Sequence, residues 1–247
     1  METLVVGAGV AGRWFADVVG DDVAFADVEE AAAETAADRI HRQHGRQGRV
    51  VDLDTEESFG LVCIAVPLPE AATAVRRHAA KAQTAVVDVT GVMEAPLAAM
   101  AAVAPARERA SYHPLFDPGD PPGRVAVARG AEGPVTDRIE RAMTDAGNDV
   151  VPIAADRHDE AMATIQGRAH AAVLAFGLAA ADVPDELATP VYEELQSLVG
   201  RITDGNPRVY RDIQATFGGA AEIADTAATL ADADATAFED LFDDAGR

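Results

Sequence analysis

A chain of 247 residues, 49% of them hydrophobic, can bury a substantial core as one large domain or two small ones. Its 42 acidic residues against 20 basic ones oppose binding to nucleic acid, and the near absence of lysine, with Lys81 alone, is typical of a halophilic surface adapted to high salt. A single cysteine, Cys63, excludes a disulfide framework, and without a leader or a membrane-length apolar stretch we expect a globular cytoplasmic protein.

The first motif is a glycine-rich turn that directly follows a predicted strand, Glu2–Val6. In such a turn the first glycine permits the tight bend, the second lets the backbone approach a pyrophosphate, and the third lets the next helix pack on its strand. A diphosphate then meets the free N–H groups and the positive end of that helix. Asp27 ends the next apolar run and is placed to accept hydrogen bonds from ribose hydroxyls, while its charge would repel a 2′-phosphate. The predicted cofactor is therefore NAD, bound by Gly7, Ala8, Gly9, Val10, Ala11, Gly12 and Asp27.

Short β-like runs then alternate with alanine-rich helical segments, which indicates a parallel sheet covered by helices. The predicted strands are Thr3–Val6, Val23–Ala26, Val50–Asp52, Leu61–Val66, Ala85–Asp88, Arg109–Tyr112, Val125–Ala128 and Asp149–Ile153. The predicted helices between them are Ala11–Val19, Glu29–Arg39, Glu70–Ala82, Ala95–Val103 and Pro134–Ala146.

From Asp156 onward the β signal disappears and the patterns are helical. One long helix is predicted over Asp156–Ala181, and others over Thr189–Thr203, Pro207–Thr216 and Ala220–Ala245. The apolar faces exceed what one short bundle needs, so part of them is expected to meet a second subunit. The predicted fold is α/β: a Rossmann-type doubly wound parallel sheet over residues 1–154, then an all-helical dimerisation domain over residues 155–247.

Ligands of open α/β sheets lie beyond the carboxyl ends of the strands, where three segments of this chain fall. Val66 and Pro67 follow the fourth strand and are predicted to form an apolar wall against the cofactor, with an ordinary strand-ending turn as the alternative. Asp88 begins the second segment, and the third contains His113. Because a residue before proline is held extended, the His113 ring is expected to project into the crevice, where it can accept a proton as alcohol oxidation requires. A histidine that merely caps a turn is the competing interpretation.

The helical part supplies further candidates. His158, Gln166 and His170 recur at four- or eight-residue steps on one slowly turning helix face, and could either bind substrate or pack. A metal site is not supported, because the two histidines are three turns apart and no Cys or carboxylate completes a set. Arg201 lies on an otherwise apolar face, where a guanidinium needs an anionic partner. That partner is either a substrate carboxylate or an acidic side chain of the same chain in a salt bridge.

Taken together, the motifs resemble the prephenate dehydrogenase family, with arogenate dehydrogenases as close relatives, over nearly the whole length. The segments that carry the resemblance are GAGVAG, IAVPLPEA, VVDVTGV, SYHPLF, HDEAMATIQGRAH, TPVYEELQSLVGRI and GNPRVYRDI. The resemblance implies a homodimer that oxidatively decarboxylates prephenate to 4-hydroxyphenylpyruvate in tyrosine biosynthesis, with NAD accepting the hydride.

The resemblance also implies roles for single residues. His113 matches the histidine that takes the proton of the ring hydroxyl, and Arg201 matches the arginine that holds a substrate carboxylate. His158, Gln166 and His170 match polar positions of the helix that lines the cleft. The family commonly reads Asp-x-x-Ser-Val-Lys after the fifth strand, with the serine hydroxyl near the catalytic histidine, whereas this chain has Gly91 and Met93 in place of the serine and lysine. Thr90, one position earlier, is the candidate replacement hydroxyl.

Three alternatives remain open from the sequence. The substrate could be arogenate, which differs from prephenate only in a side-chain amino group. A β-hydroxyacid or imine dehydrogenase of related fold is a second, although such enzymes usually employ a lysine on the first long helix after the sheet, and Lys81 lies elsewhere. The third is a regulator that binds NAD without turnover, against which the absence of a recognisable DNA-reading helix argues.

Overall fold

The structure, a computed structural model, describes residues 1–247 except the side chain of Asp185. It divides into two compact units, Met1–Asp159 and Glu160–Arg247. The division falls within helix α6 (Ala155–Met162), whereas the sequence placed the boundary at the start of that helix. No helix in the described part of the chain is both long and apolar enough to cross a membrane.

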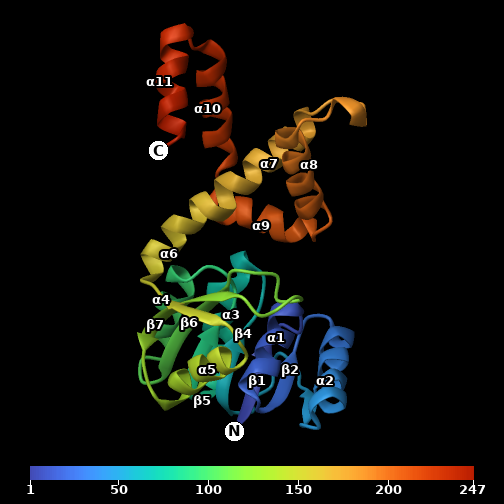
Figure 1. The fold of residues 1–247 in the computed structure, drawn as a ribbon. Helices are drawn as coiled ribbons and strands as arrows, with labels where there is room; N and C mark the ends of the chain where they lie inside the picture. The colour runs from blue at the N-terminus through green and yellow to red at the C-terminus, as the bar shows by residue number, and fades with distance from the viewer. The chain divides into compact units, whose positions relative to one another are not determined.

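The first unit is built on an eight-stranded sheet in the order β3-β2-β1-β4-β5-β6-β7-β8 (Figure 1). Neighbouring strands are parallel except for one pair, β6 and β7. The order of the first six is that of a Rossmann-type sheet, which confirms the predicted fold class. The strands are β1 (Glu2–Val6), β2 (Asp22–Ala26), β3 (Gly48–Val50), β4 (Phe59–Ile64), β5 (Ala82–Asp88), β6 (Glu108–Pro114), β7 (Arg124–Ala131) and β8 (Asp149–Pro152).

The prediction of a wholly parallel sheet is wrong at β7. Residues 115–123 connect β6 to β7 and contain no helix. Because two parallel neighbours need a crossover of a dozen or more residues, so short a connection returns the chain beside β6 in the opposite direction. His113 therefore pairs with Ala126 across an antiparallel ladder.

Helices cover both faces of the sheet. Successive strand residues point to opposite faces. Val5 belongs to a buried cluster with residues of α1 (Val10–Val19), α2 (Glu30–His44) and α5 (Pro134–Asp145), and Leu4 to a cluster with residues of α3 (Ala71–His78) and α4 (Glu94–Val103). Two short 3-10 turns, Leu68–Glu70 and Ala79–Lys81, flank α3. Burial on both faces explains why the central strands read as continuous apolar runs.

The second unit is helical, as predicted. The long helix continues from α6 through a π-helical segment, Ala163–Arg168, into α7 (Ala169–Ala179). Gly167 lies in that segment because a Cβ there would press on the Gly218 carbonyl oxygen, 2.6 Å away. The remaining elements are a 3-10 turn at Asp185–Leu187, α8 (Pro190–Thr203), α9 (Pro207–Phe217), α10 (Ala220–Asp232) and α11 (Ala235–Ala245).

The prediction of one terminal helix over Ala220–Ala245 is wrong, because two helices form. Ala233 adopts an extended conformation, and the Asp234 carboxylate accepts a hydrogen bond from the backbone N–H of Ala237 at 3.0 Å. Aspartate competes for backbone donors in this way and favours helix starts over helix interiors. The residue that interrupts the apolar stripe therefore begins α11.

Candidate active site

The parallel strands bring the predicted functional segments to one edge of the sheet. Val6 on β1 pairs with Ile64 on β4, Ile64 with Asp88 on β5, and Asp88 with Ser111 on β6. Three segments begin just beyond this row: the glycine turn, the loop that contains Val66 and Pro67, and the turn after β5. His113 lies two residues past Ser111 on the same edge. At about 4.8 Å per strand spacing, some 14 Å separates β1 from β6, which an extended dinucleotide and a substrate can bridge.

The glycine turn after β1 is packed tightly on one side and open on the other. Gly7 has a positive φ of 103°, and a Cβ there would collide with the carbonyl oxygen of Ala65. A Cβ at Gly12 would collide with the carbonyl oxygen of Gly7, so the third glycine brings α1 close to its strand. Around Gly9, by contrast, no heavy atom of the residues that the structure describes lies within 4 Å of an ideal Cβ, which leaves room for a ligand.

The groups around that opening fit a nicotinamide dinucleotide. Helix α1 has no side-chain cap, so its first N–H groups remain available to a diphosphate. Asp27 directly follows β2, and its carboxylate accepts hydrogen bonds from the backbone N–H of Ala8 at 2.6 Å and of Glu29 at 2.9 Å. The acid predicted to bind ribose is thus joined to the turn predicted to bind the diphosphate. Val66 and Pro67, half-buried, continue the loop whose residue Ala65 contacts Gly7.

The turn after β5 is held by a buried carboxyl group. Asp88 is fully buried, and burial raises its pKa to about 7 although hydrogen bonds from Thr90 act in the opposite direction. The Thr90 hydroxyl donates to Asp88 at 2.8 Å and lies 3.3 Å from the carbonyl oxygen of Val92. This hydroxyl is engaged within the turn, so Thr90 stabilises the loop on which Gly91 lies.

Gly91 lies directly against the candidate base. Its φ is +93°, and an ideal Cβ at this position would be 3.1 Å from Nε2 of His113 and 3.3 Å from its Cδ2. A side chain at residue 91 would therefore be strained in its backbone and crowded against the imidazole. This turn conformation explains physically why a glycine stands here.

His113 is held from its other ring nitrogen. Nδ1 of His113 is 2.9 Å from Nε2 of His158, and Nδ1 of His158 is 2.7 Å from the carboxylate of Asp159. His113 is 7% exposed and His158 1% exposed. Burial, and then the neighbouring His158, lower the pKa of His113 to about 3, so its ring is neutral at pH 7.

The sequence analysis missed Asp159. Its carboxylate accepts hydrogen bonds from the backbone N–H groups of Met93 and Glu94, each at 3.0 Å, where α4 begins. The signal was present, since Asp159 adjoins a candidate histidine near the start of a helix. A His-Asp pair in sequence, however, does not reveal that the neighbouring turn supplies donors from 65 residues away.

The other predicted residues belong to the second unit. The ring of His170 packs at 5.1 Å from that of Tyr210, burial lowers its pKa, and among the described residues its buried Nδ1 has no hydrogen-bond partner. Gln166 is half-buried within the π-helical segment. Arg201 is exposed in the last turn of α8, and within the described part of the chain it forms no ion pair.

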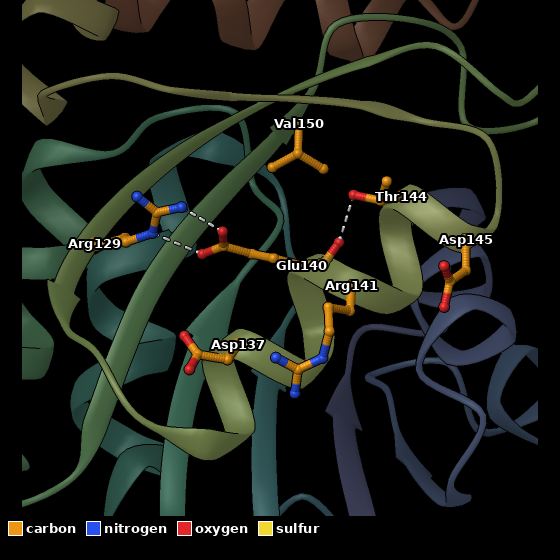
Figure 2. Close-up of a pocket in the computed structure, with 7 residues that line it drawn as sticks. All are labelled: Arg129, Asp137, Glu140, Arg141, Thr144, Asp145 and Val150. Carbon is orange, nitrogen blue, oxygen red and sulfur yellow. Dashed lines mark hydrogen bonds and ion pairs between the residues drawn. The ribbon is translucent and has the colours of Figure 1, made fainter.

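A hollow against α5 lies apart from these groups (Figure 2). Arg129 and Glu140 form an ion pair there, and Asp137, Arg141, Thr144, Asp145 and Val150 complete its lining. It contains neither the glycine turn nor His113. Its charged, open lining is that of a solvated surface depression.

Comparison with known proteins gives two relatives and one solved structure of note. The chain is 32% identical to a 4-amino-4-deoxyprephenate dehydrogenase of Streptomyces pristinaespiralis over 233 residues, which cover 88% of this chain and 77% of that protein. It is 23% identical to a probable arogenate/prephenate dehydrogenase of Methanocaldococcus jannaschii, covering 86% of this chain and 51%, about half, of that protein. A crystal structure of Aquifex aeolicus prephenate dehydrogenase with hydroxyphenyl propionate and NAD+ shares the fold, with a TM-score of 0.69 at 16% identity over 92% of this chain and 86% of that one. No family model matches the chain.

The sheet order, the glycine turn and the acid after β2 define a protein with a Rossmann-type dinucleotide domain. The similarity to the Streptomyces protein, over most of both chains, is specific enough to go further. The chain belongs to the prephenate dehydrogenase family, which includes the arogenate dehydrogenases.

Proposed function

We propose that this protein oxidatively decarboxylates prephenate to 4-hydroxyphenylpyruvate with NAD as the oxidant, a step of tyrosine biosynthesis. The observation that carries the proposal is His113: a neutral imidazole at the carboxyl edge of the sheet, held through Nδ1, with Nε2 beside Gly91. A base of this kind is what oxidation of a ring alcohol requires. Family membership supports the same reaction.

The proposed proton path runs from the ring hydroxyl to Nε2 of His113 and back to the same oxygen. As the hydride leaves the carbinol carbon, the O–H electron pair forms the C=O bond and the proton passes to Nε2. The bond to the ring carboxylate then breaks and carbon dioxide leaves. The released electron pair makes the ring aromatic, and the oxygen takes its proton back from Nε2. When bound, the nicotinamide dinucleotide supplies the hydride acceptor.

The cofactor is proposed to be NAD, held by the glycine turn, with Val66 and Pro67 beside it. The first-turn N–H groups of α1 would receive the diphosphate, and Asp27 would accept from the adenosine ribose hydroxyls. Because Asp27 is an anion already fixed by two backbone donors, a 2′-phosphate beside it would be repelled. This supports NAD over NADP.

The second unit is proposed to supply substrate contacts. Arg201 has a guanidinium without an ion-pair partner among the described residues, although the chain has 42 acidic side chains. A substrate carboxylate would satisfy it through two parallel hydrogen bonds. His170 and Gln166 are proposed to shape the same side of the substrate, and Nδ1 of His170, which has no hydrogen-bond partner in the described part of the chain, supports such a contact.

Two other substrates are candidates. The Streptomyces relative is a 4-amino-4-deoxyprephenate dehydrogenase, so a ring amine in place of the hydroxyl is a candidate substrate for this chain. Gly91 supports it, because no side chain at residue 91 constrains the group that faces Nε2 of His113. Arogenate, with its side-chain amine, is the other, in line with the Methanocaldococcus relative.

The remaining alternatives have less support. Lys81 precedes β5 at the opposite edge of the sheet from His113, and its ammonium group donates to the carbonyl oxygen of Leu53 at 2.9 Å. It therefore serves the fold and does not supply the lysine of a β-hydroxyacid or imine dehydrogenase. A regulator that binds NAD without turnover would have no use for a neutral buried imidazole at this edge.

The test is a substrate panel with a base-deletion variant. Purified protein in high salt, as its acidic surface suggests, is given NAD with prephenate, arogenate or 4-amino-4-deoxyprephenate, and NADH absorbance is followed. We expect turnover of prephenate, and a loss of about 10²-fold or more in His113→Asn with unchanged affinity for NAD. Equal turnover by His113→Asn would remove that residue from its role, and no turnover on any of the three substrates would refute the function.

The protein is further proposed to be a homodimer through its helical unit. Helices α10 and α11 contain no buried residue, and Leu230, Phe238 and Phe242 are 44%, 48% and 70% exposed. Helices of this length are marginal without a packed apolar face, so a second copy is the proposed cover. Sedimentation should give twice the mass of the chain, and Phe242→Asp should shift it toward the monomer. A monomeric wild type would contradict this.

A further inference from the structure

The clearest feature that the proposed reaction leaves unexplained is a series of buried hydrogen bonds behind His113. It runs from Nδ1 of His113 to Nε2 of His158 at 2.9 Å, and from Nδ1 of His158 to the Asp159 carboxylate at 2.7 Å. It ends on the backbone N–H groups of Met93 and Glu94 at the start of α4. The Asp159 side chain is 17% exposed, and the two imidazoles are less exposed still.

The direction of each hydrogen bond follows from the acid at the end. Although burial raises the pKa of Asp159, the hydrogen bonds from His158 and from the two backbone donors outweigh it, so the net pKa lies below the ordinary value. An ionised carboxylate only accepts, so Nδ1 of His158 carries a proton. In the proposed arrangement this is the only proton on the His158 ring, so Nε2 of His158 accepts a hydrogen bond from Nδ1–H of His113. The lone pair of His113 is left on Nε2, the nitrogen beside Gly91.

We propose that His158 and Asp159 are positioning residues, which hold His113 in the one neutral tautomer whose Nε2 can act as a base. This inference rests on the proposed function. It assigns His158 to the base and not to the substrate, because both of its ring nitrogens are engaged by His113 and Asp159. It also gives the chain a means to orient His113 without a hydroxyl at residue 91.

The same series stabilises the charge that the reaction creates. When Nε2 of His113 accepts the substrate proton, the ring becomes an imidazolium within a buried site. Asp159 is the nearby carboxylate that raises the pKa of His113, and His158 links the two. A further ionisable group of this region, Asp88, is buried, its pKa is raised to about 7, and it interacts with Asp159. The negative charge of Asp159 therefore lowers the free-energy cost of a transient proton on His113.

Substitution of Asp159 by asparagine should reverse the donor and acceptor roles along this series of hydrogen bonds. The Oδ2 position of Asp159 accepts from the backbone N–H of Met93 at 3.3 Å and of Glu94 at 3.0 Å, whereas Nδ1 of His158 faces Oδ1. An amide oxygen at the Oδ2 position would keep both backbone donors, so the NH2 group would face Nδ1 of His158. Nδ1 would then accept, Nε2–H of His158 would donate to His113, and the proton of His113 would move to Nε2. In that tautomer His113 cannot accept the substrate proton.

The direct test is nitrogen-15 NMR of the six histidines in the wild-type holoenzyme, with His113 assigned from the spectrum of His113→Asn. We expect protonated Nδ1 and unprotonated Nε2 on His113, and the opposite pattern in Asp159→Asn. A proton on Nε2 of His113 in the wild type would overturn the inference. This measurement needs no substrate, so it separates failure of the inference from failure of the proposed function. The wild-type spectrum alone can overturn the inference, so the test does not depend on the folding of Asp159→Asn.

The kinetic test compares Asp159→Asn with Asp156→Asn. Asp156 is on the same helix, exposed, and outside the series, so its variant removes an equal charge. We expect kcat to fall about 10-fold to 10²-fold in Asp159→Asn, with KM and NAD affinity within about twofold, because only proton acceptance is impaired. Asp156→Asn should match the wild type. Equal kcat in the two variants would overturn the inference, as would a loss confined to KM.

Discussion

Substitution of Gly91 by serine should impair the protein, although serine is the residue that the family commonly has there. Gly91 has a φ of +93°, which costs a non-glycine residue about 1–3 kcal/mol. The new Cβ would be 3.1 Å from Nε2 of His113, and His113 cannot easily yield because His158 holds its other side. The expected loss in free energy of unfolding is therefore about 1–3 kcal/mol.

The effect on turnover should come through displacement of His113. A shift of a reacting group by about 1 Å can cost about 10²-fold in rate, and the contact here asks for a few tenths of an ångström, so we expect roughly a tenfold fall in kcat. Gly45→Ala is the matched control, since Gly45 also has a positive φ but an open surrounding. It should lose stability and keep its turnover.

Urea unfolding and NADH formation measure the two effects for Gly91→Ser, Gly91→Ala and Gly45→Ala. If Gly91→Ser equals or exceeds the wild type in both, the turn accommodates a side chain and the reasoning from its backbone is refuted. Should serine restore what alanine loses, the hydroxyl itself is what the site lacks.

Three further predictions concern charge. Asp27→Asn removes a charged hydrogen-bond acceptor, which should raise KM for NAD about 10-fold to 10²-fold. The ratio of kcat/KM with NAD to kcat/KM with NADP should fall. An unchanged ratio would contradict the role of Asp27. With its pKa lowered to about 3, His113 stays neutral at mildly acidic pH, so kcat/KM should be flat from pH 8 to 5, whereas an acid limb near 6.5 would argue against a buried base. Native Asp88, with its pKa raised to about 7, holds a proton that the unfolded chain releases near pH 4, so its contribution to the free energy of unfolding declines as pH rises between these values. The Tm of Asp88→Asn relative to that of the wild type should therefore increase from pH 5 to 8. A constant difference in Tm would contradict this.

Local patterns were sufficient to predict the central sheet. Strands such as β4 are buried on both faces and read as continuous apolar runs, and the glycine turn has a fixed relation to its strand and helix. The antiparallel direction of β7 followed from the absence of a helix over residues 115–123, and a strand's own residue pattern does not indicate its direction. The end of α10 depended on one carboxylate, that of Asp234, which suits an N-cap better than a helix interior.

The site was predictable where chemistry follows from position along one strand, as for His113. It was not predictable where it depends on contacts between distant segments. His158 was singled out by its helical spacing, yet its ring faces His113, 45 residues earlier. Asp159 was missed because its backbone donors come from the turn before α4. From the sequence, Gly91 was interpreted as the loss of the family's serine hydroxyl, whereas its backbone conformation and its contact with His113 favour glycine.

The most direct test of the proposed reaction measures two products at once. Wild-type protein is given NAD and prephenate, and NADH absorbance and released carbon dioxide are followed in the same sample. Equal amounts of the two are expected, because loss of the hydride and loss of the carboxylate belong to one turnover. NADH without carbon dioxide would contradict oxidative decarboxylation, and neither product would contradict the proposed substrate.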